Sequence, residues 1–220
     1  MKSKKIIALV PIKSKSKRVK NKNFQLINKK PLYHYLLSKI KYCNFDDVYV
    51  DTDSSEIKNF SLKMGYKYIK RLPKLSKDSA NGNDLLNYHA KLIDADIYFQ
   101  LFITAPLLSI NTINKCIKVL KNSKKNDSIL TTKKIYSWFW FKKKPINYSP
   151  SILPRSQDAQ PIIQETTGLY GIKKDALKKL KCRIGKTPFF FDTPINETID
   201  LDNKEDFEIL AKYGKKHLLY

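Results

Sequence analysis

The chain has 220 residues, of which 42% are hydrophobic, enough to form a core and to exclude wholesale disorder. Its 43 lysine and arginine residues against 20 aspartate and glutamate residues give a formal net charge of +23 at pH 7, and only four of the basic residues are arginines. No apolar run approaches the ~20 residues of a membrane helix, no secretory signal is visible, and three scattered cysteines indicate neither disulfides nor a zinc site. We expect a single cytoplasmic domain over residues 1–220.

The first part of the chain alternates short apolar runs with amphipathic segments. Residues 5–12 form a continuous apolar run, typical of a strand buried on both faces. Pro31 then opens a segment whose apolar spacing predicts a helix. We next expect a strand at 47–52, a helix that ends at Gly65, a strand at 66–69, a helix at 84–93, a strand at 97–103, a helix at 111–122 and a strand at 128–132. This alternation predicts an α/β fold with a mostly parallel sheet and helices on both faces.

The pattern changes after residue 132. An aromatic run at 138–141 is followed by three lysines and by four prolines between 145 and 161, which excludes a regular helix or a central strand there. Residues 133–165 are therefore predicted to form an excursion from the main sheet. Beyond it we expect a strand at 168–172, a helix at 173–180, a strand at 189–191 and a closing helix at 203–211.

A basic loop directly follows the first predicted strand. Residues 13–23 contain lysines, serines and asparagines, and residues 1–45 contain no acidic residue at all. Backbone N–H groups, hydroxyls and ammonium groups at the carboxyl end of a parallel strand are suited to bind phosphates. The loop therefore predicts a triphosphate cradle, although it matches neither GxxxxGK[ST] nor GxGxxG. The alternative is a solvated basic loop with no ligand.

An acidic segment lies near the other end of the chain, where residues 196–208 hold six acids against one lysine. Within it, Asp200 and Asp202 are separated by one residue. Two carboxylates at this spacing in an extended segment point to the same side and can share one Mg²⁺. The alternative is that Asp202 only caps the closing helix.

Taken in order, these motifs resemble those of the acylneuraminate cytidylyltransferases, the enzymes that make CMP-sialic acid. The basic loop is similar to their first signature, and similar segments continue to about residue 210. These segments are Lys30-Pro31-Leu32, Val50-Asp51-Thr52-Asp53-Ser54, Arg71-Leu72-Pro73 with Ser76 and Asp78, Thr104-Ala105-Pro106-Leu107, Arg155-Ser156-Gln157-Asp158 and Ile199-Asp200-Leu201-Asp202.

The chain departs from the family pattern at four positions. Lys13 and Lys15 stand where the family has Arg and Gly, so the bidentate phosphate geometry of Arg and the close backbone approach allowed by Gly are lost. Phe102 and Leu108 stand where the family has a Gln and an Arg, a pair usually concerned with the sugar. The CTP half of the site is therefore better supported by the resemblance than the sugar half.

The resemblance implies a Rossmann-like three-layer nucleotide-diphosphosugar transferase fold with a small dimerisation excursion. The implied reaction transfers CMP from CTP to a 2-keto-3-deoxy sugar acid and releases pyrophosphate, with Lys22, Asp200 and Asp202 in catalysis and the two aspartates on Mg²⁺. A homodimer is also implied. The residues implied to bind the nucleotide are Lys13, Ser14, Ser16, Lys22, Asn23, Arg71 and Asn83, and those implied to bind the acidic sugar are Thr104, Arg155, Gln157 and Glu165.

Two other functions are compatible with the sequence. A GT-A-type glycosyltransferase would use Asp51-Thr52-Asp53 as a metal-binding Asp-x-Asp motif and would release no pyrophosphate. A nucleic-acid-binding module would account for the net charge, and its affinity would fall steeply with salt. We expect no nucleic-acid partner, because no known nucleic-acid-binding motif is present and the lysines suit a solvated surface. We expect no membrane span either, because the apolar runs are too short.

Overall fold

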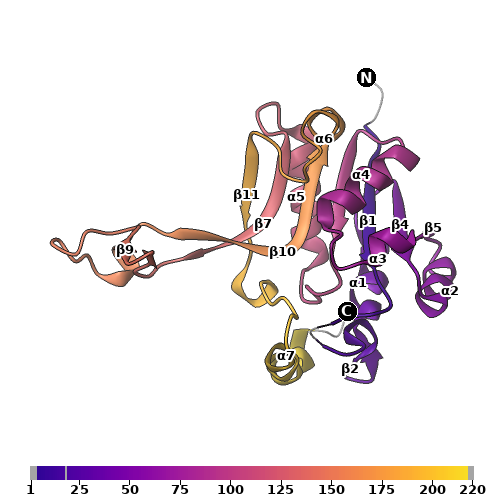
Figure 1. Ribbon diagram of the computed structural model, residues 1–220, viewed down its shortest axis with the longest axis horizontal. Helices are drawn as coiled ribbons and strands as arrows, with labels where there is room; N and C mark the ends of the chain where they lie inside the picture. Colours follow the sequence, from indigo (N-terminus) through magenta and orange to yellow (C-terminus); the bar gives the residue numbers. More distant parts are fainter. Residues whose placement is uncertain (1–3, 18, 218–220) are drawn as a thin grey trace.

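The computed structural model describes residues 4–17 and 19–217, with side chains up to residue 210. Figure 1 shows a layered α/β body from which a long arm extends. The middle layer is a seven-stranded sheet. Its strand order is β11 (Pro188–Asp192), β7 (Ser128–Ile135), β10 (Ile162–Lys173), β6 (Ile97–Leu101), β1 (Ile6–Ile12), β4 (Asp47–Thr52) and β5 (Lys67–Lys70). Only β10 runs antiparallel to its neighbours, which confirms the predicted mostly parallel sheet.

Helices cover both faces of this sheet. The alternating side chains of β1 explain why its sequence is apolar throughout: Ile6, Ala8 and Val10 pack into one core cluster, and Ile7 and Leu9 pack into another. The first cluster includes residues of α1 (Leu32–Lys39), α2 (Ser55–Lys63) and α5 (Ile110–Asn122). The second includes residues of α4 (Gly82–Leu92) and α6 (Lys174–Leu180). The two clusters confirm the predicted three-layer arrangement.

The remaining elements are short, apart from the closing helix α7 (Lys204–His217). They are the helix α3 (Pro73–Ser76), the 3-10 turns η1 (Lys22–Phe24), η2 (Ile40–Tyr42), η3 (Ser156–Asp158) and η4 (Ile195–Glu197), and the strand pairs β2 (Leu26–Ile27) with β3 (Lys30–Pro31) and β8 (Trp140–Phe141) with β9 (Lys144–Pro145). Within the described ranges, no helix combines the length and the apolar character needed to cross a bilayer.

The strand order places a crevice at the middle of the sheet. From β1 the chain proceeds outward through β4 to β5, and it then returns to form β6 on the other side of β1. At such a switch point the loops that leave the two neighbouring strands diverge to opposite faces. The carboxyl ends of β1 and β6 are therefore where this fold leaves room for a ligand.

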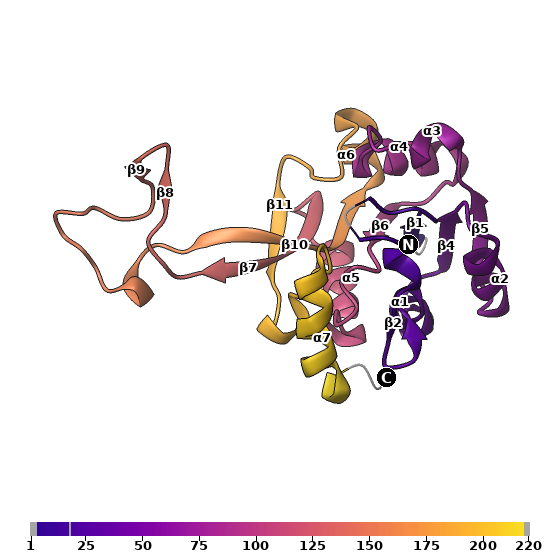
Figure 2. The same ribbon diagram turned by 60° about the horizontal axis from the view of Figure 1, so that its bottom comes forward.

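The predicted excursion is the arm seen in Figures 1 and 2. Strands β7 and β10 continue beyond the body as a two-stranded ribbon, with Ile135 paired to Ile162 and a register shift between Glu165 and Tyr170. Both strands are longer than predicted, since the ribbon is solvated and its residues lack the apolar pattern that marks a buried strand.

Candidate active site

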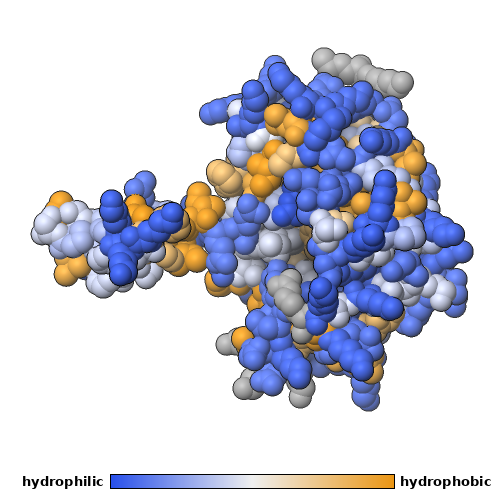
Figure 3. All heavy atoms as spheres, viewed as in Figure 1, coloured by the Kyte–Doolittle hydropathy of each residue, from blue (hydrophilic) through white to orange (hydrophobic). Residues whose placement is uncertain are grey.

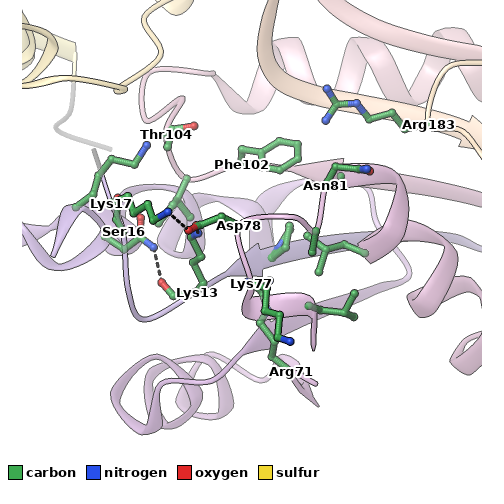
Figure 4. A pocket seen from close by; sticks show the side chains of 18 residues that line it. Lys13, Ser16, Lys17, Arg71, Lys77, Asp78, Asn81, Phe102, Thr104 and Arg183 are labelled. Atoms are coloured by element: carbon green, nitrogen blue, oxygen red, sulfur yellow. Dashed lines mark hydrogen bonds and ion pairs between the residues drawn. The ribbon is translucent and has the colours of Figure 1, made fainter. Parts of the chain in front are cut away.

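A pocket of about 530 Å³ lies at the carboxyl ends of β1 and β6. One wall is the basic loop that follows β1, and the opposite side is formed by residues 102–104, which follow β6. Figure 4 shows these walls with Lys13 and Lys17 at one end of the pocket and Arg183 at the other. The pocket thus occupies the switch point of the sheet, where α/β proteins bind their ligands.

The basic loop presents ammonium groups to the pocket. Lys13 and Lys17 both contact the carboxylate of Asp78, at 3.1 and 2.7 Å. Hydrogen bonds from Lys17 and Lys13 hold the pKa of Asp78 below its ordinary value. Because Asp78 is exposed, a polyphosphate could replace it as the partner of both lysines without burying an unpaired charge. Lys17 and Asp78 were not among the site residues predicted from the sequence.

Ser14 and Asn23, two residues predicted to bind the nucleotide, form hydrogen bonds that maintain the shape of this loop. Ser14 donates both its backbone N–H and its hydroxyl to Asp53, at 2.6 and 3.0 Å, and it does not line the pocket. The Asn23 amide donates to the carbonyl of Lys13 at 2.7 Å, while Ser16 lines the pocket. The structure therefore places Lys13, Ser16 and Asn23 at the pocket and Ser14 behind it. The adjoining Arg18 lies outside the described residues.

Lys22 connects the basic loop to the acidic segment. Its buried ammonium group donates to the carbonyl of Leu201 at 2.8 Å and to Asp202 Oδ1 at 3.2 Å. The Leu201 N–H donates in turn to the carbonyl of Thr104 at 2.8 Å. Segments separated by 180 residues therefore meet at one crevice.

The two aspartates line a second cavity, of about 420 Å³, next to this junction. Asp200 Oδ2 accepts a hydrogen bond from Thr167, but its buried Oδ1 has no hydrogen-bond partner among the residues that the structure describes. Burial raises the pKa of Asp200. A nearby cation would stabilise the ionised carboxylate in this setting.

The residues present fit a Mg²⁺ site completed by substrate. Magnesium in phosphate-transferring sites commonly takes one or two protein carboxylates, with the remaining ligands from phosphate and water. Asp200 and Asp202 supply two such carboxylates on one cavity wall. Among the described residues, no group of three or more His, Cys, Asp and Glu side chains forms a complete protein cage.

The alternative role for Asp202 as the helix cap is wrong. The N-terminal cap of α7 is Asn203, whose Oδ1 accepts from the Asp206 N–H at 2.9 Å. Asp206 Oδ2 accepts from the backbone N–H groups of Asn203 and Asp202, at 2.9 and 2.6 Å. Because Asn203 performs the capping, the Asp202 carboxylate faces the cavity and Lys22.

Arg71 reaches the pocket from a buried ionic network. Its guanidinium contacts both carboxylate oxygens of Asp51, at 3.0 and 3.3 Å, and His89 Nε2 lies 2.7 Å from Asp51 Oδ2. All three side chains are buried, and Arg71 also lines the pocket. Burial by itself raises the pKa of Asp51, but hydrogen bonds from His89 and Arg71 outweigh it and lower that pKa.

This network also bears on the Asp-x-Asp alternative. The carboxylate of Asp51 is occupied by Arg71 and His89, and that of Asp53 accepts hydrogen bonds from Ser14 and Ser76. Both aspartates therefore bind within the protein, and the structure offers the GT-A hypothesis no carboxylate pair at this position.

The residues predicted to bind the sugar are only partly brought together. Thr104 lines the pocket, and Glu165 lines the cavity that contains the two aspartates. Arg155 and Gln157 lie instead on the arm, where both are exposed: Arg155 directly precedes η3 and Gln157 lies within it. Neither residue lines either of these two cavities. Arg155 pairs with Asp158 at 2.6 Å.

Asn83 contacts Arg183, a pocket residue that was not predicted from the sequence. The Asn83 side-chain oxygen accepts from the backbone N–H of Arg183 at 2.9 Å, and Asn83 does not itself line the pocket. Arg183 does line it, as do Phe102 and Gly82. No local motif marks Arg183, because it is one arginine in a basic stretch and only the tertiary fold brings it to the pocket.

Comparison with known proteins assigns the family. A family model described as cytidylyltransferase matches residues 7–139, which include the basic loop and the strands on both sides of the pocket. The chain belongs to the cytidylyltransferase family. The predicted family resemblance is thereby confirmed.

Curated members of the family with different substrates are similar to this cytidylyltransferase chain. It is 24% identical over 218 residues to N-acylneuraminate cytidylyltransferase A of Danio rerio, covering 94% of this chain and 50% of that protein. It is 27% identical over 193 residues to 3-deoxy-manno-octulosonate cytidylyltransferase of Rickettsia typhi, covering 81% of this chain and 77% of that protein. The chain thus spans about half the length of the N-acylneuraminate enzyme that it matches.

Solved structures support the fold assignment. CMP:2-keto-3-deoxy-manno-octonic acid synthetase complexed with CTP superposes with a TM-score of 0.70 at 17% identity, covering 96% of this chain and 99% of that one. A 4-diphosphocytidyl-2C-methyl-D-erythritol synthase from Anaerococcus prevotii superposes with a TM-score of 0.69 at 13% identity, covering 97% of each chain. The fold is that of these nucleotidyltransferases.

Proposed function

We propose that this cytidylyltransferase transfers CMP from CTP to a hydroxyl of a 2-keto-3-deoxy sugar acid and releases pyrophosphate. The observation that carries the proposal is the contact of Lys22 with Leu201 and Asp202. It joins a lysine-lined pocket to a pair of carboxylates, which is the arrangement that a metal-bound nucleoside triphosphate requires. The relatives that act on sugar acids support the acceptor class.

The side chains have separate tasks in this proposal. Phosphoryl transfer spreads negative charge over phosphoryl oxygens, so the protein mainly positions groups and neutralises charge. Lys13, Lys17 and Lys22 would bind the triphosphate, and Arg71 would face the cytosine and ribose. Asp200 and Asp202 would hold Mg²⁺, which when bound would supply further positive charge to the phosphates.

A coupled pyrophosphate assay tests the function directly. The purified protein is mixed with CTP, Mg²⁺ and, one at a time, a panel of 2-keto-3-deoxy sugar acids. We expect pyrophosphate release that requires CTP, Mg²⁺ and one of the acids together. No release with any acid would contradict the proposal, and turnover of a nucleotide sugar without pyrophosphate would support the glycosyltransferase instead.

Lys22→Met should lower kcat by at least ~100-fold, because the variant removes the buried ammonium group between the triphosphate and the acidic segment. Methionine keeps the length of the side chain, so the fold should be retained. Lys20→Met is the matched control, since Lys20 is an exposed lysine on the same loop. A Lys22→Met variant with kcat within threefold of the parent would exclude this role for Lys22.

We also propose that the arm pairs two copies of the chain. It exposes apolar side chains that a monomer would leave in water, including Trp138, Trp140, Phe141 and Ile152, which are 42, 58, 63 and 80% exposed. Figure 3 shows apolar atoms along the arm and where it joins the body. In a dimer, Arg155 and Gln157 could contact the acid bound by the other copy, and their predicted role in sugar recognition depends on this.

Sedimentation velocity would detect this pairing. The parent chain should sediment as a dimer, and the double variant Trp140→Ser, Phe141→Ser should raise the dimer dissociation constant by roughly 100-fold or more, because it removes two large apolar anchors. Leu92→Ser is the control, since Leu92 is a 55% exposed apolar residue at the end of α4 on the body. A monomeric parent chain, or equal effects of the two changes, would argue against the arm as the interface.

A further inference from the structure

Arg183 is held rigidly at the end of the pocket opposite the lysines. Its guanidinium carbon lies 3.6 Å from the ring centroid of Tyr170 and 5.8 Å from that of Phe102. Its backbone N–H is fixed by Asn83. Figure 4 shows the Phe102 ring between the lysine end and Arg183. Stacking of this kind orients a planar guanidinium while its edges stay available for hydrogen bonds.

The N–H groups of this guanidinium have no hydrogen-bond acceptor within the part of the chain that the structure describes. The nearest acid is Glu165, whose Oε2 lies 4.0 Å from Arg183 Nη2, beyond hydrogen-bond distance. That same carboxylate oxygen accepts a hydrogen bond from Tyr170 at 2.5 Å. A ligand in the pocket could therefore accept hydrogen bonds from the Arg183 guanidinium, which lines it.

Gly82 leaves the space that Arg183 uses. A Cβ atom at this position would stand 2.7 Å from Arg183 Nη1 and 3.3 Å from Gln100 Oε1. The guanidinium therefore lies directly against the backbone at the first turn of α4. Any side chain at residue 82 would displace it.

We infer that Arg183 binds the carboxylate of the acid acceptor, an inference that rests on the proposed cytidylyltransferase function. A planar guanidinium matches a carboxylate with two parallel hydrogen bonds. The negative charge of Glu165 beside it repels a multiply charged phosphate more strongly than a singly charged carboxylate, so this position favours the carboxylate. The triphosphate is already provided for by the lysines at the other end, and Phe102 and Tyr170 offer apolar surface to the carbon skeleton of a sugar acid.

Binding measurements test this without requiring turnover. The probes are 3-deoxy-manno-octulosonate and N-acetylneuraminate, titrated into CMP-saturated protein and followed by NMR line broadening, with CTP titrated separately by calorimetry. Arg183→Gln should raise the Kd of the acid that binds by about 10- to 100-fold, the value of a charge-assisted pair, and leave the Kd of CTP within twofold. Arg183→Lys should recover part of the loss.

Two further variants separate binding from structure. Gly82→Ala keeps the arginine but pushes its guanidinium aside, so it should also weaken binding of the acid more than binding of CTP. Lys186→Gln removes a positive charge from an exposed residue of the same loop and should change neither Kd.

Three results would overturn this role of Arg183: neither acid binds the parent protein, Arg183→Gln leaves acid binding unchanged, or Arg183→Gln weakens CTP binding as much as acid binding. Acid binding that depends on Arg183 in a protein that releases no pyrophosphate would reject the proposed function and leave the binding role standing.

Discussion

Asp200→Asn is expected to reduce Mg²⁺-dependent pyrophosphate release by roughly a thousandfold, because charge stabilisation by a metal is worth several kcal/mol in the transition state. The change removes the charge of the carboxylate while it keeps the shape of the side chain. Among the described residues Asp200 Oδ1 has no hydrogen-bond partner and Asp200 forms no ion pair, so the substitution breaks none there. The measurement is kcat in the coupled assay over a range of Mg²⁺ concentrations.

The control for this experiment is Glu205→Gln. Glu205 is exposed in the first turn of α7 and belongs to the same acidic segment, so it tests whether the general negative charge matters. We expect its rate to stay within twofold of the parent. If Asp200→Asn kept a rate within threefold of the parent at every Mg²⁺ concentration, Asp200 would not be a metal ligand.

Asp51→Asn is expected to lower the free energy of unfolding by about 3–5 kcal/mol, because it leaves the buried Arg71 without its counter-charge. The quantity to measure is the urea midpoint at neutral pH. Asp47→Asn provides a matched comparison: Asp47 lies on the same strand, and its ion pairs with Lys5 and Lys67 are partly exposed. This change should cost less than about 1 kcal/mol. Equal losses would show that burial of the network contributes nothing.

The effect of Asp51→Asn should also depend on pH. The pKa of Asp51 in the folded protein lies below its ordinary value of 3.8. Between these two pKa values the unfolded chain therefore binds more protons than the folded chain. The stability that Asp51 contributes is complete at pH values above its ordinary pKa, and it is lost as the pH falls through its pKa in the folded protein. Urea titrations from pH 7 to pH 3 should show the difference between parent and variant shrinking below about pH 4. A difference that grew in acid would contradict the assigned ion pair.

The sequence alone determined the layered fold, and it predicted the chemistry that we propose for the lysine-lined end of the pocket. The strand at 47–52 has the predicted bounds, and β1 differs from its prediction by one residue, because burial on both faces leaves an apolar run that is local in the chain. The basic loop and the aspartate pair could be recognised for the same reason, since each motif is contiguous. Their ordered succession was enough to indicate the family.

The tertiary structure alone decided which residues share a cavity. Arg183 reaches the pocket from a loop far from the basic loop in sequence, and nothing local distinguishes it from other surface charges. Asp78 belongs to a segment that resembles the family, but only the fold shows that it pairs with Lys13 and Lys17. Asn203 rather than Asp202 caps α7 because hydrogen-bond geometry, and not residue type, selects the cap. Arg155 lies on the arm because the ribbon of β7 and β10 carries it away from the body. Contacts between distant segments depend on how the chain crosses from strand to strand, and a local sequence pattern does not contain that information.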